Sequence, residues 1–129
     1  PGTPGGERLE YRLGAFDVAL AFGPLDFVQV NGVLNARMVE YALGWLAAGP
    51  EHTVLDLYCG LGNFTLPLAR TAKQVLGVEG EAGLVARAHA NAAANAIANA
   101  EFAVADLSAD LRGEPWARGR FDRVLLDPP

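Results

Sequence analysis

The sequence predicts an α/β fold, with a mostly parallel, doubly wound sheet that follows a short N-terminal β-hairpin. Short apolar runs alternate with helical patterns from residue 53 to the end of the chain. Apolar strands of this kind are typical of a parallel sheet covered on both faces, and right-handed crossovers make such a sheet doubly wound. The length of 129 residues corresponds to one domain, and an apolar share of 51% is enough for a buried core.

The first fifty residues predict a hairpin and a helix. Residues 1–7 are rich in Pro and Gly and are expected to form a flexible lead-in to a domain over residues 8–129. Apolar alternation on both sides of Gly14 predicts two short strands between residues 9 and 22. A helix is expected over residues 33–47, ended by Gly49-Pro50. The apolar positions at helical spacing are Val33, Leu34, Met38, Tyr41, Ala42 and Trp45.

Four strands and two further helices are expected after residue 50. The expected strands are 53–58, 74–79, 102–105 and 121–127, and the helices are 64–72 and about 81–99. The second of these helices is rich in alanine, which favours helix. The fourth strand would leave an open edge, which complete domains usually cover. The sequence is therefore interpreted as a partial domain, truncated after the fourth strand.

The charge balance argues against a protein that binds nucleic acid on its own. The formal net charge is −5, and Lys73 is the only lysine. Because nucleic-acid binding needs Lys and Arg to displace counterions from phosphates, most contacts to such a substrate would lie outside this polypeptide.

The sequence predicts no membrane partner, no metal site and a cytoplasmic location. It contains no run of about 18 apolar residues and no basic segment followed by an apolar one at its start. Cys59 is the only cysteine, which excludes an intramolecular disulfide and a Cys-rich metal site. His52 and His89 have no partner at metal-ligand spacing. A reducing compartment is therefore expected.

A glycine turn after the first parallel strand is the first candidate binding motif. The segment Asp56-Leu-Tyr-Cys-Gly60-Leu-Gly62-Asn63 leads from a strand into a helix. Its glycines let the backbone approach a ligand closely or adopt a positive φ, although a merely tight turn is the alternative. Thr65 stands where the third glycine of the dinucleotide fingerprint would fall, which argues against NAD or FAD.

Carboxylates end the following strands. Glu79 is placed to accept hydrogen bonds from ribose hydroxyls, and Asp106 to accept from an adenine amino group. Asp127 precedes two prolines, which aim it at the crevice beyond the strand ends. The alternatives are a solvated Glu79, a capping role for Asp106 and prolines that only end a strand. The turn and the acids together predict a nucleoside ligand without phosphates, which S-adenosylmethionine fits.

These motifs, in order from about Leu9 to Pro129, resemble the RNA (uracil-5-)-methyltransferases. The segments are DFVQVN (26–31), VLDLYCGLGNFTLPLA (54–69), GVEG (77–80), the helix with Asn91 and Asn95, and FDRVLLDPP (121–129). GLGNFTLPLA and GVEG are closer to the 23S ribosomal RNA branch than to the transfer-RNA branch. The resemblance implies a Rossmann-like class I methyltransferase fold and S-adenosylmethionine as the cofactor.

The resemblance also implies a set of cofactor contacts. They are Gln29, Tyr58, Asn63, Glu79, Asp106 and Asp127, and Gly60 and Gly62 complete the predicted cofactor site. Gln29 would close over the methionine portion, or be only a polar residue before a helix. Tyr58 would offer an aromatic edge, or pack in the core. Asn63 would bind the methionine moiety, or act only as an N-cap.

No catalytic residue is expected within this chain. Methylation of uracil at C5 needs a nucleophile that attacks C6 and a base that removes the C5 proton. The resembled family uses a Cys and a Glu that lie downstream of the DPP motif. Cys59 belongs to the cofactor turn, is not expected to be that nucleophile, and the chain alone is expected to be inactive.

The expected function is the cofactor-binding part of a uracil-C5 RNA methyltransferase that acts on 23S ribosomal RNA. RNA would be bound through the full-length protein, because the family's ribosomal branch carries iron–sulfur cysteines and an RNA-binding β-barrel upstream. The alternatives are a methyltransferase for the exocyclic amines of adenine or guanine, and an inactive cofactor-binding module. Asn91, Asn95 and Asn99 are interpreted as one polar helix face, with support of the cofactor site by Asn91 as the alternative.

Overall fold

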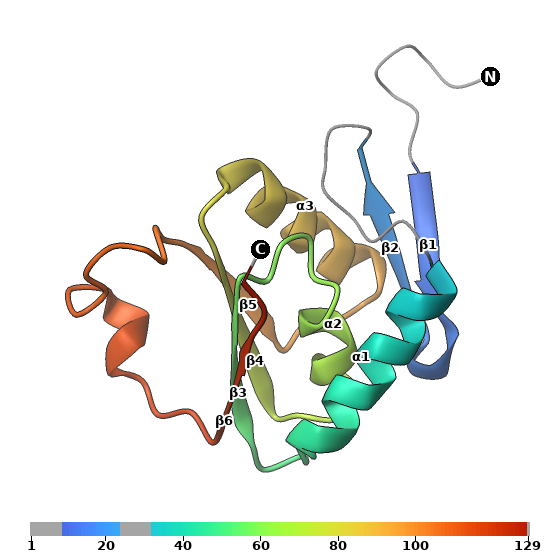
Figure 1. Cartoon of the computed structure of the whole chain (residues 1–129), viewed down its shortest axis with the longest axis horizontal. Coiled ribbons are helices and arrows are strands. Elements are labelled where there is room, and N and C mark those ends of the chain that lie inside the picture. Colours follow the sequence, from blue (N-terminus) through green and yellow to red (C-terminus); the bar gives the residue numbers. More distant parts are fainter. Residues whose placement is uncertain (1–8, 24–31, 129) are drawn as a thin grey trace.

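The computed structural model describes residues 9–23 and 32–128 and confirms the α/β fold (Figure 1). Four parallel strands lie in the spatial order β5-β4-β3-β6. They are β3 (Thr53–Leu57), β4 (Gln74–Glu79), β5 (Ala100–Val104) and β6 (Arg123–Leu126). The chain runs outward from β3 to β5 and then returns to the other side of β3. Open α/β sheets bind ligands at such a reversal, beyond the carboxyl ends of the strands.

The connections between strands cover both faces of the sheet. Three helices, α1 (Gly32–Leu46), α2 (Thr65–Ala69) and α3 (Ala82–Ala94), lie on one face, and the segment between β5 and β6, with the 3-10 turn η2 (Pro115–Arg118), lies on the other (Figure 1). This arrangement confirms the doubly wound sheet. The second face carries a loop with one 3-10 turn in place of a full helix.

Two helices end earlier than predicted. α3 ends at Ala94 rather than near Asn99, because Asn95 leaves the helical conformation and Ala96 adopts a left-handed φ of 55°. After Ala69 the chain tightens, and the amides of Arg70 and Thr71 donate to carbonyls three residues back. α2 is therefore one buried segment of five residues.

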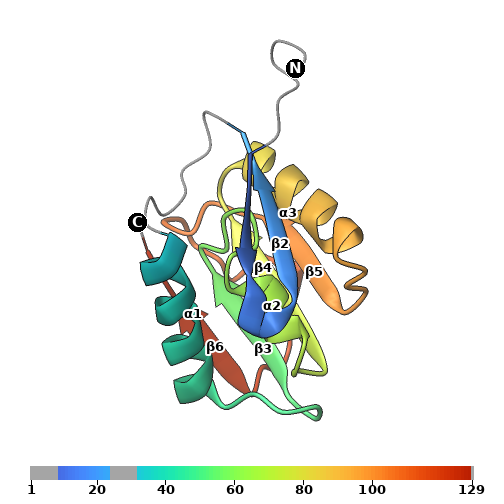
Figure 2. The same cartoon turned by 90° about the vertical axis from the view of Figure 1, so that its right-hand side faces the viewer.

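The N-terminal hairpin is confirmed and lies outside the layer of helices. β1 (Leu9–Leu13) and β2 (Val18–Phe22) pair antiparallel across the short turn η1 (Gly14–Phe16). Figure 2 shows the hairpin in front of α2, with α1 on one side and α3 on the other. The expected lead-in, residues 1–7, lies outside the described residues.

The sheet is packed on both faces. Val54 and Leu55 are adjacent in β3 and belong to different core clusters, as the two-residue period of a strand requires. The cluster on the helix side joins the sheet to the hairpin and the helices, and its fully buried members include Leu13, Val18, Leu20, Val39, Val54, Leu66, Leu68 and Val75. The cluster on the other side is smaller and holds Leu55, Val78 and Ala105 with Trp116 and Phe121 packed against them.

α1 presents most of its predicted apolar stripe to solvent. Val33, Leu34, Met38, Tyr41 and Trp45 are exposed. The face that packs on the core instead carries the fully buried Val39 and the buried Asn35. The spacing thus predicted the helix correctly, but the apolar residues are too numerous on α1 to identify its buried face.

Two absences concern the described residues alone. No helix within residues 9–23 and 32–128 is long and apolar enough to cross a membrane. The same residues contain no group of three or more His, Cys, Asp or Glu side chains that could hold a metal ion.

The orientation of α1 can be tested with one substitution at two positions. Val39→Ala should lower the free energy of unfolding by about 1–3 kcal/mol, because it opens a cavity at a fully buried site. Val33→Ala removes the same atoms from a side chain that is 68% exposed and should change stability by less than about 0.5 kcal/mol. Urea unfolding measures both. Equal losses would contradict the observed orientation.

Candidate cofactor site

The glycine turn between β3 and α2 is held in a conformation that needs its glycines. Gly60 has a φ of 56° and Gly62 a φ of 105°. A Cβ at Gly62 would lie 3.2 Å from Cγ of Leu66, whereas a Cβ at Gly60 would meet no atom within 4 Å. Tyr58 also adopts a left-handed φ, of 63°, which is strained for a residue with a side chain. Backbone strain of this kind is concentrated at binding sites.

Glu79 joins the tip of β4 to this turn. One carboxylate oxygen, Oε1, accepts a hydrogen bond from the amide of Gly60 at 3.1 Å, and Oε2 accepts from the amide of Glu81 at 3.0 Å. A carboxylate oxygen can accept two hydrogen bonds, so each keeps capacity for a further donor. Glu79 therefore shapes the turn and remains able to bind a hydroxyl group, as predicted for a ribose.

Asp56 is a fully buried carboxylate at the base of the turn. The Thr65 hydroxyl donates to its Oδ2 at 2.6 Å, while Oδ1 is buried without a hydrogen-bond partner. Burial raises the pKa of Asp56 to about 7; the Thr65 bond opposes this shift, and the charges of Asp127 and Glu79 add to it. An acceptor without a partner at this depth fits a site made for a positively charged or hydrogen-bond-donating ligand.

The Asn63 side chain is engaged within the protein. Its Oδ1 accepts from the Tyr11 hydroxyl and from Nδ2 of Asn35, both at 2.9 Å, and its Nδ2 donates to Oδ1 of Asn35 at 2.8 Å. α2 has no side-chain N-cap bond. The capping alternative is therefore wrong, and Asn63 instead ties the turn to β1 and to α1. Whether it also binds a ligand, as the resemblance implies, stays a prediction.

Three more predicted site residues, Tyr58, Asp106 and Asp127, lie at or near the carboxyl edge of the sheet. Asp106 is exposed, and its Oδ1 accepts from the amide and the hydroxyl of Ser108 at 3.0 and 2.6 Å. These hydrogen bonds close a turn after β5 and lower the pKa of Asp106; no helix begins there, so Asp106 holds a turn rather than capping a helix. Asp127 is exposed just beyond β6, and Tyr58 is half-buried. Gln29 lies outside the described residues.

A family comparison connects this geometry to known proteins. A sequence model described as tRNA (Uracil-5-)-methyltransferase matches residues 17–124. The chain belongs to this family. The resemblance inferred from the motifs is thereby confirmed.

Relatives within the family favour its ribosomal branch. The 23S rRNA (uracil(1939)-C(5))-methyltransferase RlmD of Stenotrophomonas maltophilia (strain K279a) is 59% identical over 124 residues, which cover 96% of this chain and 28% of that protein. RlmD of Xylella fastidiosa (strain 9a5c) is 59% identical over 121 residues, which cover 94% of this chain and 27% of that protein. The chain thus spans little more than a quarter of the length of these relatives.

Solved structures confirm the Rossmann-like class I methyltransferase fold. The Pyrococcus abyssi tRNA (uracil-54, C5)-methyltransferase in complex with S-adenosyl-L-homocysteine superposes with a TM-score of 0.77 at 28% identity, over 95% of this chain and 28% of that chain. A T. thermophilus 16S rRNA N2-guanine methyltransferase in complex with AdoMet and guanosine gives a TM-score of 0.70 at 28% identity, over 95% of this chain and 33% of that chain.

Cys59, the one thiol of this family member, is held in an unreactive state. It is 4% exposed, and a Cβ at Gly77 would lie only 2.9 Å from its Sγ. Burial raises the pKa of the Cys59 thiol well above its usual range, and the charges of Asp56 and Glu79 add to the shift. A nucleophile needs the thiolate form, so these observations agree with a packing role.

Three polar residues that hold the turn were missed or misread in the sequence. Asp56 was the lone carboxylate within an apolar strand, a signal that could have been used. Asn35 stood among exposed apolar residues and gave no signal. Asn91 was interpreted as part of a polar helix face, but it is 2% exposed and bonded to the hairpin and to the glycine turn. The bond from Asn91 to Leu61 agrees with the alternative given for this residue, that it supports the cofactor site, which stays a prediction.

The buried carboxylate makes stability depend on pH. The folded state raises the pKa of Asp56 from 3.8 to about 7, so it binds this proton more tightly than the unfolded chain does. The proton on Asp56 therefore adds to the free energy of unfolding at low pH, and this stabilisation is lost as the pH rises from 3.8 to about 7. Between about pH 5 and about pH 7, the free energy of unfolding should fall by ~2 kcal/mol more than in Asp56→Asn, which does not titrate.

Denaturant unfolding of both proteins across this range measures the difference in slope. Asp122→Asn is a control, because Asp122 is an exposed carboxylate at the other end of the sheet and asparagine keeps an acceptor for the Thr53 amide that Asp122 binds at 2.8 Å. Parallel curves for the wild-type protein and Asp56→Asn would contradict the buried, proton-binding state of Asp56.

Proposed function

We propose that this chain is the S-adenosylmethionine-binding portion of an RNA methyltransferase that transfers a methyl group to C5 of uracil in 23S ribosomal RNA. The observation that carries the proposal is the Glu79 carboxylate, which reaches from β4 to the glycine turn and still has acceptor capacity. The names of the RlmD relatives support the reaction and the RNA, and S-adenosyl-L-homocysteine in the P. abyssi structure supports the cofactor.

The described residues fit this cofactor chemically. Glu79 would accept from the ribose hydroxyls, and the second oxygen of Asp106 would accept from the adenine amino group. Asp127 would lie between the cofactor and the target base. The negative potential of Asp56, Glu79 and Asp127 suits the positive sulfonium and ammonium groups of the cofactor. When bound, S-adenosylmethionine supplies an electrophilic methyl group.

The proposed cofactor site includes further contacts carried over by position. Tyr58 would offer its ring edge, Asn63 would bind the methionine moiety, and Gly60 and Gly62 would allow the close approach of backbone to ligand. Gln29 would close over the methionine portion. The proposed location of the whole protein is the cytoplasm.

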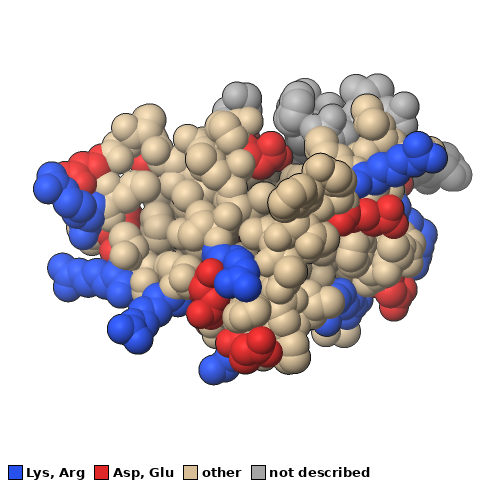
Figure 3. All heavy atoms as spheres, turned by 60° about the horizontal axis from the view of Figure 1, so that its bottom comes forward, with Lys and Arg blue, Asp and Glu red and all other residues tan. Residues whose placement is uncertain are grey.

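RNA would be bound mainly by other parts of the full-length protein. The chain carries a net charge of −5. On the face shown in Figure 3, basic side chains gather at the left-hand end, and basic and acidic side chains lie side by side near the centre. Arg112, for example, is paired with Asp110 at 2.7 Å. Pairing of this kind and the negative net charge reduce the positive charge available to phosphates.

Transfer to an exocyclic amine is the less supported candidate. The structural likeness to the 16S rRNA N2-guanine methyltransferase has 28% identity, against 59% for the relatives named for uracil C5. An inactive cofactor-binding module would share the site geometry, and the two experiments below separate it from the main proposal.

Glu79→Gln tests the cofactor site directly. Titration calorimetry with S-adenosyl-L-homocysteine should show a loss of about 1–3 kcal/mol in binding free energy, because the site loses its charged acceptor. The glutamine can still accept from the Gly60 amide through its oxygen, so the turn keeps one of its two anchors. Glu101→Gln, an equivalent change on the exposed side of β5, should leave the affinity within about twofold. Equal affinities for Glu79→Gln and the wild-type chain would refute the ribose assignment.

The chain alone should transfer no methyl group to RNA. Its one thiol is buried and protonated, and the family's catalytic Cys and Glu are expected elsewhere in the full-length protein. Labelled S-adenosylmethionine and undermethylated 23S ribosomal RNA provide the assay, with Cys59→Ser as the comparison. Uracil methylation by the wild-type chain that Cys59→Ser abolishes would show that Cys59 is the nucleophile.

A further inference from the structure

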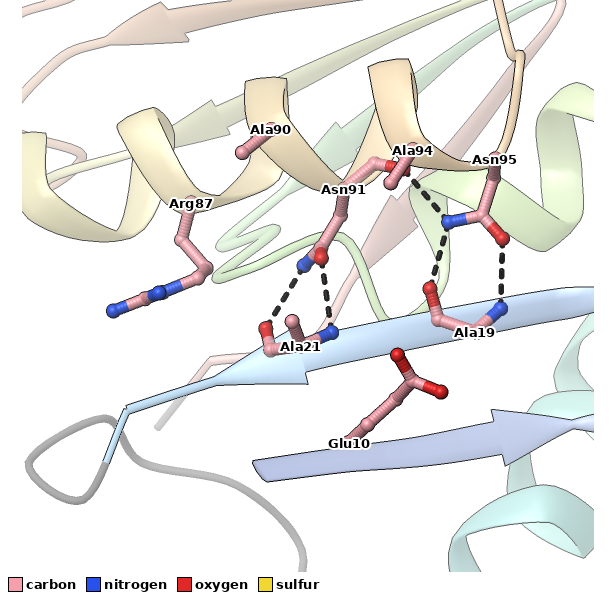
Figure 4. A pocket seen from close by; sticks show the side chains of 8 residues that line it. All are labelled: Glu10, Ala19, Ala21, Arg87, Ala90, Asn91, Ala94 and Asn95. Atoms are coloured by element: carbon pink, nitrogen blue, oxygen red, sulfur yellow. Dashed lines mark hydrogen bonds between the residues drawn. The ribbon is translucent and has the colours of Figure 1, made fainter. Parts of the chain in front are cut away.

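Asn91 in α3 and Asn95, the residue that directly follows this helix, take the place of a neighbouring strand along the outer edge of β2. Oδ1 of Asn95 accepts from the Ala19 amide and its Nδ2 donates to the Ala19 carbonyl, both at 2.7 Å. Asn91 forms the same pair of bonds with Ala21, at 2.9 and 3.1 Å. Figure 4 shows both side chains pointing from the helix to the strand, each with two bonds to one alanine.

The spacing of these contacts follows from helix and strand geometry. Residues four apart in a helix are about 6 Å apart along its axis, and residues two apart in a strand are separated by nearly 7 Å. Asn91 and Asn95 therefore match Ala21 and Ala19, whose backbone groups point away from β1. The cavity of about 120 Å³ beside them is lined by four alanines, the two asparagines, Glu10 and Arg87, and it is much smaller than typical ligand pockets.

Asn91 and Asn95 differ in the partner of their third bond. Nδ2 of Asn95 donates to the Asn91 carbonyl at 2.7 Å, whereas Nδ2 of Asn91 donates to the Leu61 carbonyl in the glycine turn at 3.1 Å. Leu61 and Gly62 share one peptide plane, whose amide donates to the Cys59 carbonyl at 3.0 Å. Both ends of this peptide are thus bound. A glycine accepts positive and negative φ readily, so without these bonds the peptide could rotate into another orientation.

We propose that Asn91 is a positioning residue for the cofactor turn. It fixes the Leu61–Gly62 peptide in the orientation that the site requires, and it makes that orientation depend on how the hairpin sits against α3. The Tyr11 hydroxyl, which donates to Asn63, links the same hairpin to the other end of the turn. The position of the hairpin thus affects the conformation of the turn that forms the cofactor site. This role rests on the proposed function of the turn.

Asn91→Asp and Asn95→Asp form a matched pair for the test. Both changes keep the acceptor for a β2 amide, remove the amide donors and add one charge, at a buried position for Asn91 and a half-buried one for Asn95. Only Asn91→Asp removes a bond to the glycine turn. In amide hydrogen exchange followed by NMR, Asn91→Asp should accelerate exchange at Gly62 by roughly tenfold or more, and Asn95→Asp by less than about twofold.

The affinity for S-adenosyl-L-homocysteine provides a second readout. Asn91→Asp should weaken binding by roughly tenfold, and Asn95→Asp should leave it within about twofold. Equal acceleration at Gly62 in both variants, or none in Asn91→Asp, would overturn the positioning role. If the wild-type chain does not bind the ligand, the proposed function fails, while the exchange rates still decide the role of Asn91.

A second pair guards against a variant that does not fold. Asn91→Ala and Asn95→Ala avoid the buried charge; alanine also raises helix propensity at Asn91, whereas Asn95 lies just after the helix. The same contrast at Gly62 is expected between them. Matching exchange rates at Gly62 in these two variants would overturn the proposal as well.

Discussion

The hydrogen bonds of the Glu79 carboxylate connect the sheet to the turn on which the site depends. Parallel strands place β3 and β4 side by side, so the carboxyl end of one lies next to the turn that follows the other. Glu79 uses this neighbourhood to hold the amides of Gly60 and Glu81 at once. Hydrogen bonds to a charged acceptor are stronger than neutral ones. One side chain therefore orders the turn after β3 and the entry to α3, and both segments border the same crevice.

Three carboxylates at one edge of a sheet repel one another, and the fold accommodates this in different ways. Glu79 is stabilised by two backbone amides, and Asp127 is exposed to water. Asp56 is buried away from water and accepts only one hydrogen bond, from Thr65. Its charged form is therefore poorly stabilised, and its pKa is raised. A cation in the crevice would offset this repulsion, which is why the arrangement favours a positively charged ligand over an anionic one.

Local sequence patterns correctly predicted the elements whose conformation depends mainly on neighbouring residues. β4 was predicted to the residue, because a buried parallel strand is a continuous apolar run, and the strand-end acids followed from the strands. The buried face of α1 could not be predicted, because Val33 and Val39 look alike in the sequence and only the packed sheet distinguishes them. The end of α3 was missed for a related reason. The Asn95 side chain bonds to Ala19, 76 positions away, and such a contact leaves no trace in a local pattern.

The repeated asparagines at positions 91 and 95 form hydrogen bonds inside the protein, although such a repeat is typical of a helix surface exposed to water. A four-residue repeat of asparagines is typical of a polar, solvated helix surface, and the side chains here are indeed polar. Each side-chain amide, however, has a donor and an acceptor, as a peptide group does, so it can satisfy the open edge of a strand. The Asn95 side chain forms hydrogen bonds with β2 and with the Asn91 carbonyl. The Asn91 side chain forms them with β2 and with the Leu61 carbonyl. Because Asn91 forms all three of its bonds while nearly excluded from water, losing any of them would leave a buried polar group without a partner. The conformation of the turn and the position of the hairpin on α3 are therefore energetically coupled, although nearly forty residues separate them in the sequence.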